Sequence, residues 1–433
     1  MFVPVDNASR QAIDSVARLD DFPDSGPART PISNSIGTTM SDRKILIVGA
    51  GLGGLSAACC LMKAGFDVEI YEQARVLGEV GAGIQLSANA MHVMQYLGLD
   101  EAIIKVGVKP GAYVFRLHDT GEFIQQFPLS EEHERQHGAP YIQIHRADLH
   151  DLLVEKANKF NPDVIHLNKQ AVSFSEDENG IELKFGDGTA ARGEFLVGAD
   201  GLKSTIARQI VGQIPASYTG DAAWRITVPV ERLPNNFLDQ VMSVFMGPGG
   251  HAVCYYVRAG KLLNFVGIVE TDDVFEESWT MKFPWQRLKD TYRGWHSTIQ
   301  VVIDAADKDK CYRWSLHNRL PIRNWSTPRA TILGDAAHAT LPYLAQGAAM
   351  AIEDGAVLAR SVRQSATVPE ALDLYQRNRV DRTARVVEQS TQNRALFHLN
   401  SEAEIRSAFA RRNEGAARNK WLYSYNPLTV ELT

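Results

Sequence analysis

Lys44–Gly65 reads KILIVGAGLGGLSAACCLMKAG, and this order of residue types gives the first prediction of the fold. The apolar run KILIV ends at a glycine and predicts a short strand buried in a parallel sheet. The segment from Gly54 to Gly65 is rich in small and apolar residues and predicts a helix that closes at its last glycine. Asp67–Gln73, DVEIYEQ, predicts the next strand. Strand, helix and strand in this order indicate a βαβ unit.

Three glycines after the first predicted strand form the pattern G-x-G-x-x-G: Gly49, Gly51 and Gly54. The first makes a tight turn, the second lets a pyrophosphate approach the backbone, and the third lets helix and strand pack closely. Such a triplet alone also occurs in plain tight turns. Here Glu72 follows at the offset of about 20 residues expected of an acceptor for a ribose hydroxyl. The combination predicts a dinucleotide site, and the acid favours a 2′-hydroxyl over a 2′-phosphate.

The composition is that of an ordinary globular chain. Of the 433 residues, 45% are hydrophobic and 22% charged, which is typical of soluble domains, and the length suits two or three domains. The net charge of −6 gives no electrostatic reason to expect nucleic acid as a partner. The 4 cysteines have neither disulfide-framework nor metal-ligand spacing. We therefore expect a cytoplasmic protein without a metal.

The first forty residues do not resemble a targeting sequence. They contain prolines and acidic residues and no apolar central segment, which argues against both a secretory signal and a transit peptide. No apolar run in the chain approaches the roughly 20 residues that cross a bilayer. We interpret residues 1–40 as a disordered extension and expect no stable membrane association.

A second region of the sequence is rich in strands. Between Asp221 and Glu270, four apolar stretches follow one another without long helices, which predicts a mostly antiparallel sheet. Residues 111–127, GAYVFRLHDTGEFIQQF, are expected to add a hairpin to that sheet. From Pro369 onward the pattern is helical.

Two further hairpins are predicted between residues 171 and 201, where apolar and polar residues alternate. The dipeptides Asn179-Gly180 and Asp187-Gly188 interrupt the alternation. Such dipeptides supply the positive φ angles that two-residue hairpin turns require.

Two more motifs join a predicted strand to a predicted helix. FLVGADGLKSTIAR places Asp200 at such a junction, where the plain alternative is an aspartate that caps the helix. ATILGDAAH places Asp335 after a strand, where a carboxylate can accept hydrogen bonds from a polyol. QGAAMAIEDG then begins a helix whose free amides, around Gly347 and Ala348, would stabilise the negative charge of a reduced flavin. The alternative for this last stretch is close packing of helix on sheet.

The three motifs together resemble those of the FAD-dependent aromatic hydroxylases, the single-component class A flavoprotein monooxygenases. The resemblance runs from about Arg43 into the helices after Gly355 and rests on GAGLGG, GADGLKS and LGDAAHATLPYLAQGAAMAIEDG. GEVGAGIQLSANAM and YIQIHRADLHDLL are similar to the enzymes that act on salicylate, 3-hydroxybenzoate and 6-hydroxynicotinate. The resemblance implies an α/β fold with an α+β second domain: a Rossmann-like FAD-binding domain, a mostly antiparallel β-sheet substrate domain and C-terminal helices.

The resemblance also implies that one FAD molecule contacts all three motifs, with NADH or NADPH as a transient co-substrate. The glycines and the ribose acid would hold the ADP half, and an arginine would contact the phosphate and ribityl region. Asp200, in GADGLKS, would serve the structure and the reduction by nicotinamide. Asp335 would bind the ribityl and pyrophosphate groups. The cofactor residues implied are Gly49, Gly51, Gly54, Glu72, Gln85, Arg146, Asp200, Asp335, Pro342, Gly347 and Ala348.

The substrate side depends on GHAVCYYVR. In a strand, His251, Val253 and Tyr255 share one face, while Cys254 and Tyr256 point to the other. The resemblance implies that His251 and Tyr255 are catalytic and line the substrate pocket, where the imidazole takes a proton from a phenol. The alternative is a core histidine satisfied by backbone groups.

Arg225, on the predicted strand AWRITVPV, can pair bidentately with a substrate carboxylate; a solvated or flavin-adjacent arginine is the open alternative. Tyr343, assigned to the substrate, and Pro342 stand where related hydroxylases carry His or Gln, so the substrate's identity stays open. His338 is expected to make hydrogen bonds within its own motif. Three arginines of the late helical region are expected to form a solvated or inter-domain face and not a binding patch: Arg379, Arg382 and Arg385.

The reaction implied is hydroxylation of a small aromatic hydroxy acid by O2 through a flavin C4a-hydroperoxide, with decarboxylation where a carboxylate leaves. The alternatives are a non-hydroxylating FAD oxidoreductase of the same fold and a non-catalytic nucleotide-binding protein, and a homodimer is left open. The expected domains are an FAD-binding domain (41–110, 141–218 and 320–365), a substrate-binding domain (111–140 and 219–319) and a C-terminal helical region (366–433).

Overall fold

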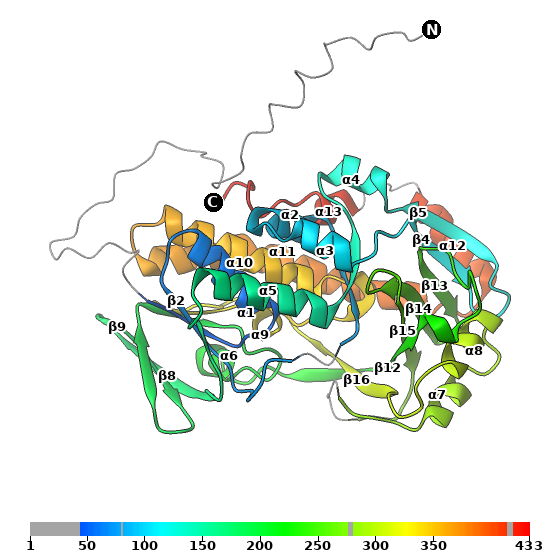
Figure 1. Ribbon diagram of the computed structural model, residues 1–433, viewed down its shortest axis with the longest axis horizontal. Helices are drawn as coiled ribbons and strands as arrows, with labels where there is room; N and C mark the ends of the chain where they lie inside the picture. The colour runs from blue at the N-terminus through cyan, green and yellow to red at the C-terminus, as the bar shows by residue number, and fades with distance from the viewer. Residues whose placement is uncertain (1–43, 79–80, 276–279, 414–418) are drawn as a thin grey trace, which may run out of the picture.

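The computed structural model describes residues 44–78, 81–275, 280–413 and 419–433. The sequence prediction for residues 1–40 therefore lies outside the described residues. Two large sheets stand at opposite ends of the molecule (Figure 1). Two long helices connect them: α10 (Gly347–Gln364) and α11 (Val368–Phe397). This is the mixed α/β fold predicted from the sequence.

The first sheet is parallel and contains the predicted βαβ unit. Its strands are β1 (Ile45–Val48), β2 (Val68–Tyr71), β7 (Ile165–His166), β11 (Phe195–Gly198) and β17 (Ala330–Ile332), in the spatial order β17-β11-β1-β2-β7. The helices beside them are α1 (Leu52–Lys63), α5 (Arg146–Phe160), α6 (Thr205–Val211) and α9 (Asp335–His338). β1 is buried along its whole length, as expected of a strand covered on both faces. Helices α1 and α10 lie in close contact, since a Cβ on Gly355 would stand 2.7 Å from the amide nitrogen of Ala57.

A small antiparallel sheet carries the two predicted hairpins. It consists of β8 (Ala171–Asp177), β9 (Gly180–Phe185) and β10 (Ala190–Gly193). The turns lie at the predicted dipeptides, but only their glycines have positive φ, so the predicted pair of positive angles is wrong. The aspartates instead accept turn amides: Asp177 Oδ1 from the amide of Asn179 at 2.7 Å, and Asp187 Oδ1 from the amide of Thr189 at 2.9 Å. Side-chain acceptors of this kind stabilise a turn without a left-handed residue at its first position.

The larger sheet is the predicted, mostly antiparallel one. Its strands are β4 (Ala112–Leu117), β5 (Phe123–Pro128), β12 (Ala216–Pro229), β13 (Met242–Gly247), β14 (Gly250–Val257), β15 (Leu262–Glu270) and β16 (Tyr312–Arg319), in the order β16-β12-β15-β14-β13-β4-β5. The predicted hairpin is β4 with β5. It joins the sheet through a parallel pairing of β4 with β13.

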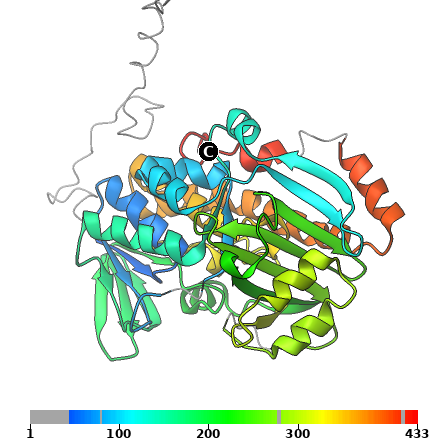
Figure 2. The ribbon, with the colours of Figure 1, turned by 45° about the vertical axis from the view of Figure 1, so that its right-hand side comes forward.

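The two faces of the larger sheet have different neighbours (Figure 2). One face packs on α7 (Trp285–Thr291) and α8 (Ser297–Asp304). The other faces the end of α11 and α12 (Glu402–Asn413). This second face points into the molecule and positions the candidate substrate residues.

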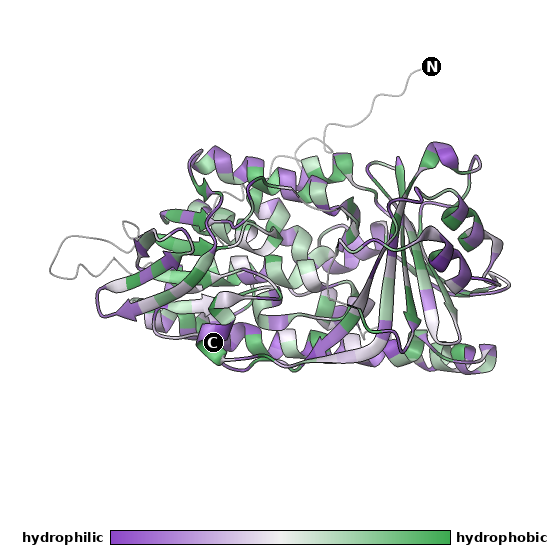
Figure 3. Cartoon of the chain, turned by 90° about the horizontal axis from the view of Figure 1, so that it is seen from below, coloured by the Kyte–Doolittle hydropathy of each residue, from purple (hydrophilic) through white to green (hydrophobic). Residues whose placement is uncertain are grey.

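Short elements connect these layers. They are β3 (Gly83–Leu86), which pairs with β6 (Ile142–His145), together with α2 (Ala88–Leu97), α3 (Asp100–Val106), α4 (Glu131–His137), the 3-10 turns η3 (Val230–Arg232) and η4 (Pro342–Leu344), and α13 (Lys420–Tyr423). Polar residues interrupt the apolar ones along the helices (Figure 3). In the part of the chain described, none of the helices has the length and apolar character that crossing a bilayer needs.

Candidate functional site

The glycine turn after β1 has one open position and two closed ones. A Cβ on Gly49, whose φ is +103°, would collide with the carbonyl oxygen of Ala199, and one on Gly54 would collide with the carbonyl of Gly49. A Cβ on Gly51, by contrast, would have no atom within 4 Å apart from those of its chain neighbours and its own helix backbone. Gly51 is also the N-cap of α1 and has no side-chain cap, so the first amides of this helix are free to bind an anion.

Glu72 stands beside this turn at the end of β2. Its Oε2 accepts the amide of Ala50 at 2.8 Å and its Oε1 accepts the amide of Ala74 at 2.8 Å. These bonds fix the carboxylate next to the glycine turn. Each carboxylate oxygen retains a further lone pair, which suits a ribose hydroxyl.

The motif that contains Asp335 packs against the start of α1, although the two lie far apart in the sequence. Gly334, with φ +61°, is the N-cap of α9, and Asp335 is exposed at the start of that helix. The connection runs through Gly53, where a Cβ would stand 2.9 Å from the Leu333 side chain and 3.2 Å from Ala351 Cβ. The start of α1, the end of β17 and the first turns of α10 therefore meet.

The start of α10 resembles that of α1. Its N-cap, Gln346, makes no side-chain cap, and its first turn has no acidic residue. The Gln346 side chain turns away instead, donating to Ser87 Oγ at 3.0 Å and accepting from Asn89 Nδ2 at 2.9 Å. The half-buried Gly347 and Ala348 follow it. The chain enters the helix through η4, where Pro342 is exposed and Ala345 has a φ of +54°.

Asp200 has the role that the plain alternative gave it. Its Oδ2 accepts the amides of Thr205 at 2.7 Å and Ile206 at 3.3 Å, and its Oδ1 accepts the Ser204 hydroxyl. Both oxygens thus order the start of α6. Leu202, two residues further, lines the same narrow cleft as Asp335, so this loop borders the proposed cofactor path without directing its carboxylate into it.

Gln85 and Arg146 lie where the short β3–β6 pair meets the larger sheet. Gln85, on β3, is half-buried and its Nε2 lies 3.4 Å from Met242 Sδ. Arg146 begins α5 and is held by its amide, which donates to the carbonyl of Ala82 at 2.8 Å. Tyr255 reaches the same junction: a Cβ on Gly83 would overlap its ring. The hydroxyl-bearing ring of Tyr255 thus packs directly on the backbone of β3.

The alternation predicted for β14 is confirmed. Val253 and Tyr255 pack with residues on the inner face of the sheet, whereas Cys254 and Tyr256 pack toward α7 and α8. Arg225 is on the inner face too, because it pairs with Val266, which pairs with Val253. It is only 4% exposed, so the solvated reading is wrong. Its guanidinium lies 5.0 Å from the Tyr312 ring and 5.5 Å from the Trp314 ring.

His251 is buried and contacts the end of α11. Its Nδ1 lies 3.2 Å from Nε2 of His398, and its ring contacts those of Phe397 and Tyr343 at centroid distances of 4.9 and 5.5 Å. Burial, and then the neighbouring His398, hold the pKa of His251 well below 6.5. The imidazole is therefore neutral, and one of its two nitrogens carries a lone pair. The partner of its Nδ1 is a side chain, so the predicted alternative of a histidine satisfied by backbone does not describe it.

Tyr343 belongs to a polar cluster that the sequence did not reveal. Its hydroxyl donates to Asp221 Oδ2 at 2.7 Å, and Arg394 binds the same carboxylate through Nε and Nη2 at 2.5 and 2.8 Å. Burial, and then Asp221, raise the pKa of Tyr343. Asp221, Arg394 and His398 come from distant parts of the chain, and no local motif marks them.

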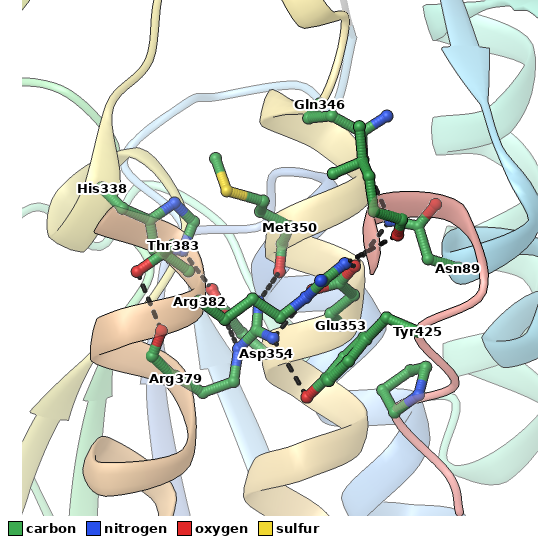
Figure 4. Close-up of polar contacts among 12 residues, drawn as sticks. Asn89, His338, Gln346, Met350, Glu353, Asp354, Arg379, Arg382, Thr383 and Tyr425 are labelled. Atoms are coloured by element: carbon green, nitrogen blue, oxygen red, sulfur yellow. Dashed lines mark hydrogen bonds and ion pairs between the residues drawn. The ribbon is translucent and has the colours of Figure 1, made fainter. Parts of the chain in front are cut away.

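A second buried network lies under the start of α10 (Figure 4). Arg379 of α11 is fully buried and pairs with Glu353 at 2.7 Å and with Asp354 at 2.7 Å. Arg382 pairs with Glu353 at 2.6 Å. His338 Nε2 lies 2.6 Å from Asp354 Oδ2, which confirms the expected hydrogen bond within its motif. Arg379 is not solvated as one of the predicted readings had it, and the network joins α9, α10 and α11 into one unit.

Comparison with known proteins agrees with this geometry. The family model described as "FAD binding domain" matches residues 42–390. The chain is 36% identical over 362 residues to 3-hydroxybenzoate 6-hydroxylase of Polaromonas naphthalenivorans (83% of this chain, 89% of that protein). It is 32% identical over 400 residues to 6-hydroxynicotinate 3-monooxygenase of Pseudomonas fluorescens (90% and 96%).

Solved structures share the architecture. Klebsiella pneumoniae HpxO, in complex with FAD and uric acid, superposes with a TM-score of 0.77 at 25% identity, over 89% of this chain and 96% of that chain. A salicylate hydroxylase in a substrate complex gives a TM-score of 0.74 at 22% identity, over 91% and 99%. The second likeness concerns the fold alone.

Proposed function

The chain belongs to the family of FAD-binding-domain proteins, whose model covers residues 42–390, and from that premise we propose that it hydroxylates a small aromatic hydroxy acid. Its close relatives are aromatic-ring monooxygenases. NADH or NADPH and O2 are the co-substrates in this proposal. The observation that carries it is the meeting of the three motifs at Gly53, Leu333 and Ala351, with the His251 ring contacting Tyr343 just before α10.

The residues present fit FAD. A pyrophosphate needs a backbone turn without a side chain, and Gly51 offers open space at an uncapped helix start. Ribose and ribityl hydroxyls need acceptors, and the carboxylates of Glu72 and Asp335 can supply them. The electron-rich edge of a flavin needs donors, which the uncapped amides of Gly347 and Ala348 provide.

FAD bound here, once reduced by nicotinamide, supplies the activated oxygen. The protein's own residues must hold the aromatic ring, take its hydroxyl proton and keep water away. His251 is the group placed for proton transfer, since it is neutral and Nδ1 already has a partner. Val253, Val266 and Phe397 give the surrounding surface its apolar character.

The substrate we propose carries both a ring hydroxyl and a carboxylate. The relatives are named for 3-hydroxybenzoate and 6-hydroxynicotinate, and both compounds have these two groups. Arg225 lies on the same face of the sheet as His251, separated from β14 by the strand β15. A cation buried against two aromatic rings suits a planar carboxylate. Tyr255 and Tyr343 would set the width of the pocket between these two groups.

We propose the domain division expected from the sequence. Apart from the first three residues of β12, the larger sheet and its two covering helices use residues within 111–140 and 219–319, which supports one substrate-binding unit. The parallel sheet draws its strands from residues within 41–110, 141–218 and 320–365. The C-terminal helices from residue 366 onward contact both units, because Tyr375 packs in the first core and Phe397 in the second.

The test is a substrate panel with FAD-loaded full-length protein. Hydroxybenzoates and hydroxynicotinates are each scored for NADH and NADPH oxidation, O2 uptake and product mass. We expect one of these acids to stimulate nicotinamide oxidation and to gain one oxygen atom. A colourless protein that binds no FAD would overturn the proposal, and stimulated oxidation that yields only hydrogen peroxide would support a non-hydroxylating oxidoreductase.

Variants of the same protein test the roles of single residues. His251→Asn should lower the rate of ring hydroxylation by about 10²–10⁴, the usual contribution of a general base, and should leave FAD bound. Asp335→Ala should instead release FAD. Loss of FAD from the His251 variant would show that the histidine serves the fold and not the chemistry.

A further inference from the structure

A line of three side chains leads from the interior of the molecule to its surface. His251 on β14 is 2% exposed, and its Nδ1 lies 3.2 Å from Nε2 of His398, the residue that ends α11. Nδ1 of His398 lies 3.1 Å from Oε1 of Glu270, at the end of β15. The Glu270 side chain is 47% exposed. The two histidines thus contact each other nitrogen to nitrogen, and His398 connects the pair to one solvent-accessible carboxylate.

Glu270 determines which nitrogen of each ring carries the proton. A carboxylate only accepts, so Nδ1 of His398 must donate to it, which leaves Nε2 of His398 as an acceptor in the neutral ring. Nδ1 of His251 must then donate to that Nε2. The remaining nitrogen, His251 Nε2, is left without a proton and makes no hydrogen bond within the described part of the chain. It is therefore the ring nitrogen of the line that can accept a proton from a ligand.

We propose that His398 and Glu270 relay to solvent the proton that His251 takes from the substrate's ring hydroxyl. The inference rests on the proposed function, which gives His251 its substrate. His251 would be the catalytic base, because it touches the reacting hydroxyl. His398 and Glu270 would act through it, as relay residues that set its tautomer and remove its proton.

The proton count of the relay balances. The hydroxyl O–H bond breaks and its proton binds Nε2 of His251, while the proton on Nδ1 of His251 passes to Nε2 of His398. The proton on Nδ1 of His398 passes to Glu270, which releases it to water. The same transfers in reverse restore both tautomers when the product regains its hydroxyl proton, so no oxidant or reductant is needed.

The outer end of the line opens on water. Glu270 lines a surface cleft of about 380 Å³ together with Gly249, Thr271, Asp273 and Arg287. Val269 and Trp295 also line it and, like Arg287, belong to the side of the sheet that α7 and α8 cover, so a proton can leave there without water entering the apolar surface near Val253. This separation matters because water at the reaction centre would waste the activated oxygen.

Other charged groups hold the line in place. Arg394 of α11 binds Asp221 of β12 through two nitrogens, and its Nη2 also donates to Glu270 at 3.3 Å. Tyr343 from η4 donates to Asp221. Asp221, Glu270 and His398 together have the spacing of metal ligands, but the Arg394 guanidinium already occupies Asp221 and repels a cation. These contacts disfavour a metal ion at this cluster.

The charges agree with two neutral rings at rest. Burial lowers the pKa of His398, and Asp221 and Glu270 oppose that effect. Burial, and then His398, lower the pKa of His251. A charge left on the buried inner ring is therefore unfavourable, which favours passing the proton along the line toward the exposed Glu270.

The first test needs no turnover. Histidine side chains labelled with ¹⁵N in the FAD-loaded full-length protein report their tautomers by NMR, and the variants His251→Asn and His398→Asn assign the two rings. We expect a proton on Nδ1 of both rings at neutral pH. A proton on Nε2 of His251 would overturn the relay, whether or not the enzyme hydroxylates any acid in the panel.

The second test follows the proton itself. The oxidised holoenzyme is mixed in weak buffer with the aromatic acid that stimulates it, and a pH indicator records proton release. His398→Ala should slow the release about tenfold or more, and added imidazole should restore it. His118→Asn, on a partly exposed histidine at the end of β4, serves as the matched control and should release the proton at the wild-type rate. Release from His398→Ala at the wild-type rate, or slow release that imidazole does not change, would overturn the relay while leaving the proposed function intact.

Discussion

At the residue scale, two glycines of the turn have different roles: the structure requires a glycine at Gly49 for the fold, and we assign Gly51 to cofactor binding. Gly49 needs its hydrogen because it has a φ of +103° and lies against the carbonyl of Ala199, whereas Gly51 adopts an ordinary φ of −75° and faces open space. The pattern G-x-G-x-x-G does not distinguish these positions. The structure does, and it shows which of the two substitutions should leave the fold intact.

We predict opposite outcomes for two alanine substitutions in this turn. Gly51→Ala should keep the unfolding temperature of the apo-protein and weaken FAD binding by about 1–3 kcal/mol, the usual cost of forcing a methyl group into a filled space. Gly49→Ala should lower the unfolding temperature of the apo-protein itself. Thermal unfolding without FAD, followed by titration of flavin fluorescence, distinguishes the two. An apo-protein destabilised equally by both changes would contradict this reading of the turn.

Single residues also show where sequence reasoning ends. The face of β14 that carries His251 followed from strand alternation, which is local and has a fixed period. The partner of His251 did not, because His398 is 147 residues away and pairs through the packing of a helix end on a sheet. Arg225 was left undecided for the same reason: its burial depends on rings contributed by β16.

At the element scale, α10 and α11 are joined by buried charge. Arg379 lies between Glu353 and Asp354, and all three side chains are fully buried. Burial by itself would raise the pKa of Asp354, but His338 and Arg379 outweigh it and lower that pKa. Both carboxylates therefore remain charged and depend on the arginine.

We predict that Arg379→Gln destabilises the protein by about 3–5 kcal/mol, because it leaves buried carboxylates without their partner. Arg377→Gln is the matched control on the same helix. Arg377 forms an exposed ion pair with Asp373, and such pairs contribute less than about 1 kcal/mol. Urea unfolding of both variants measures the difference. Equal midpoints would show that the buried network contributes no more than a surface pair.

The helix α4 provides a pH-dependent contact with the C-terminal segment. His133 packs against Tyr141 and Tyr423 at ring distances of 5.4 and 5.2 Å. Burial, and then His137, lower its pKa from 6.5 to about 3. His133 therefore becomes protonated near pH 6.5 in the unfolded chain, whereas in the folded chain it stays neutral down to a much lower pH. The stability due to this residue is complete above pH 6.5 and is lost as the pH falls from there toward 3.

We predict that His133→Phe reduces the loss of stability in mild acid. A single such histidine contributes about 1.4 kcal/mol for each pH unit below 6.5, and phenylalanine keeps the ring contacts without the titrating nitrogens. The measurement is the free energy of unfolding at several values between pH 7.5 and pH 5. The variant's slope should be shallower than that of the wild type, and parallel slopes would mean that His133 is protonated in the folded state.

At the scale of the whole molecule, the sequence predicted the parts better than their arrangement. The strand–turn–helix units were predictable because glycines and aspartates mark them locally. The order of the larger sheet was not, since β4 runs parallel to β13 although more than a hundred residues separate them. The meeting of Gly53 with Ala351 likewise depends on the whole parallel sheet.

The C-terminal segment, residues 419–433, packs against the buried network of α10 and α11. Arg382 donates to the carbonyls of Trp421 and Leu422 at 3.1 Å each, and its guanidinium lies 3.6 Å from the Tyr425 ring. Arg360 donates to the carbonyl of Pro427 at 2.8 Å. Through Arg360 these contacts connect the end of the chain to α10, the helix whose start we propose to face the flavin.

We therefore predict that this segment affects FAD binding from a distance. Leu422, buried against Met350 and Val386, is the position to change: Leu422→Ala should destabilise the protein by about 2–5 kcal/mol and should also raise the Kd of FAD, because Met350 lies in the first turn of α10. Deletion of Thr433 alone is the control, since its contacts with Asn378 are exposed. Calorimetry gives the stability and flavin fluorescence gives the Kd. A destabilised Leu422 variant whose folded form binds FAD as the wild type does would show that α10 keeps its position without the segment.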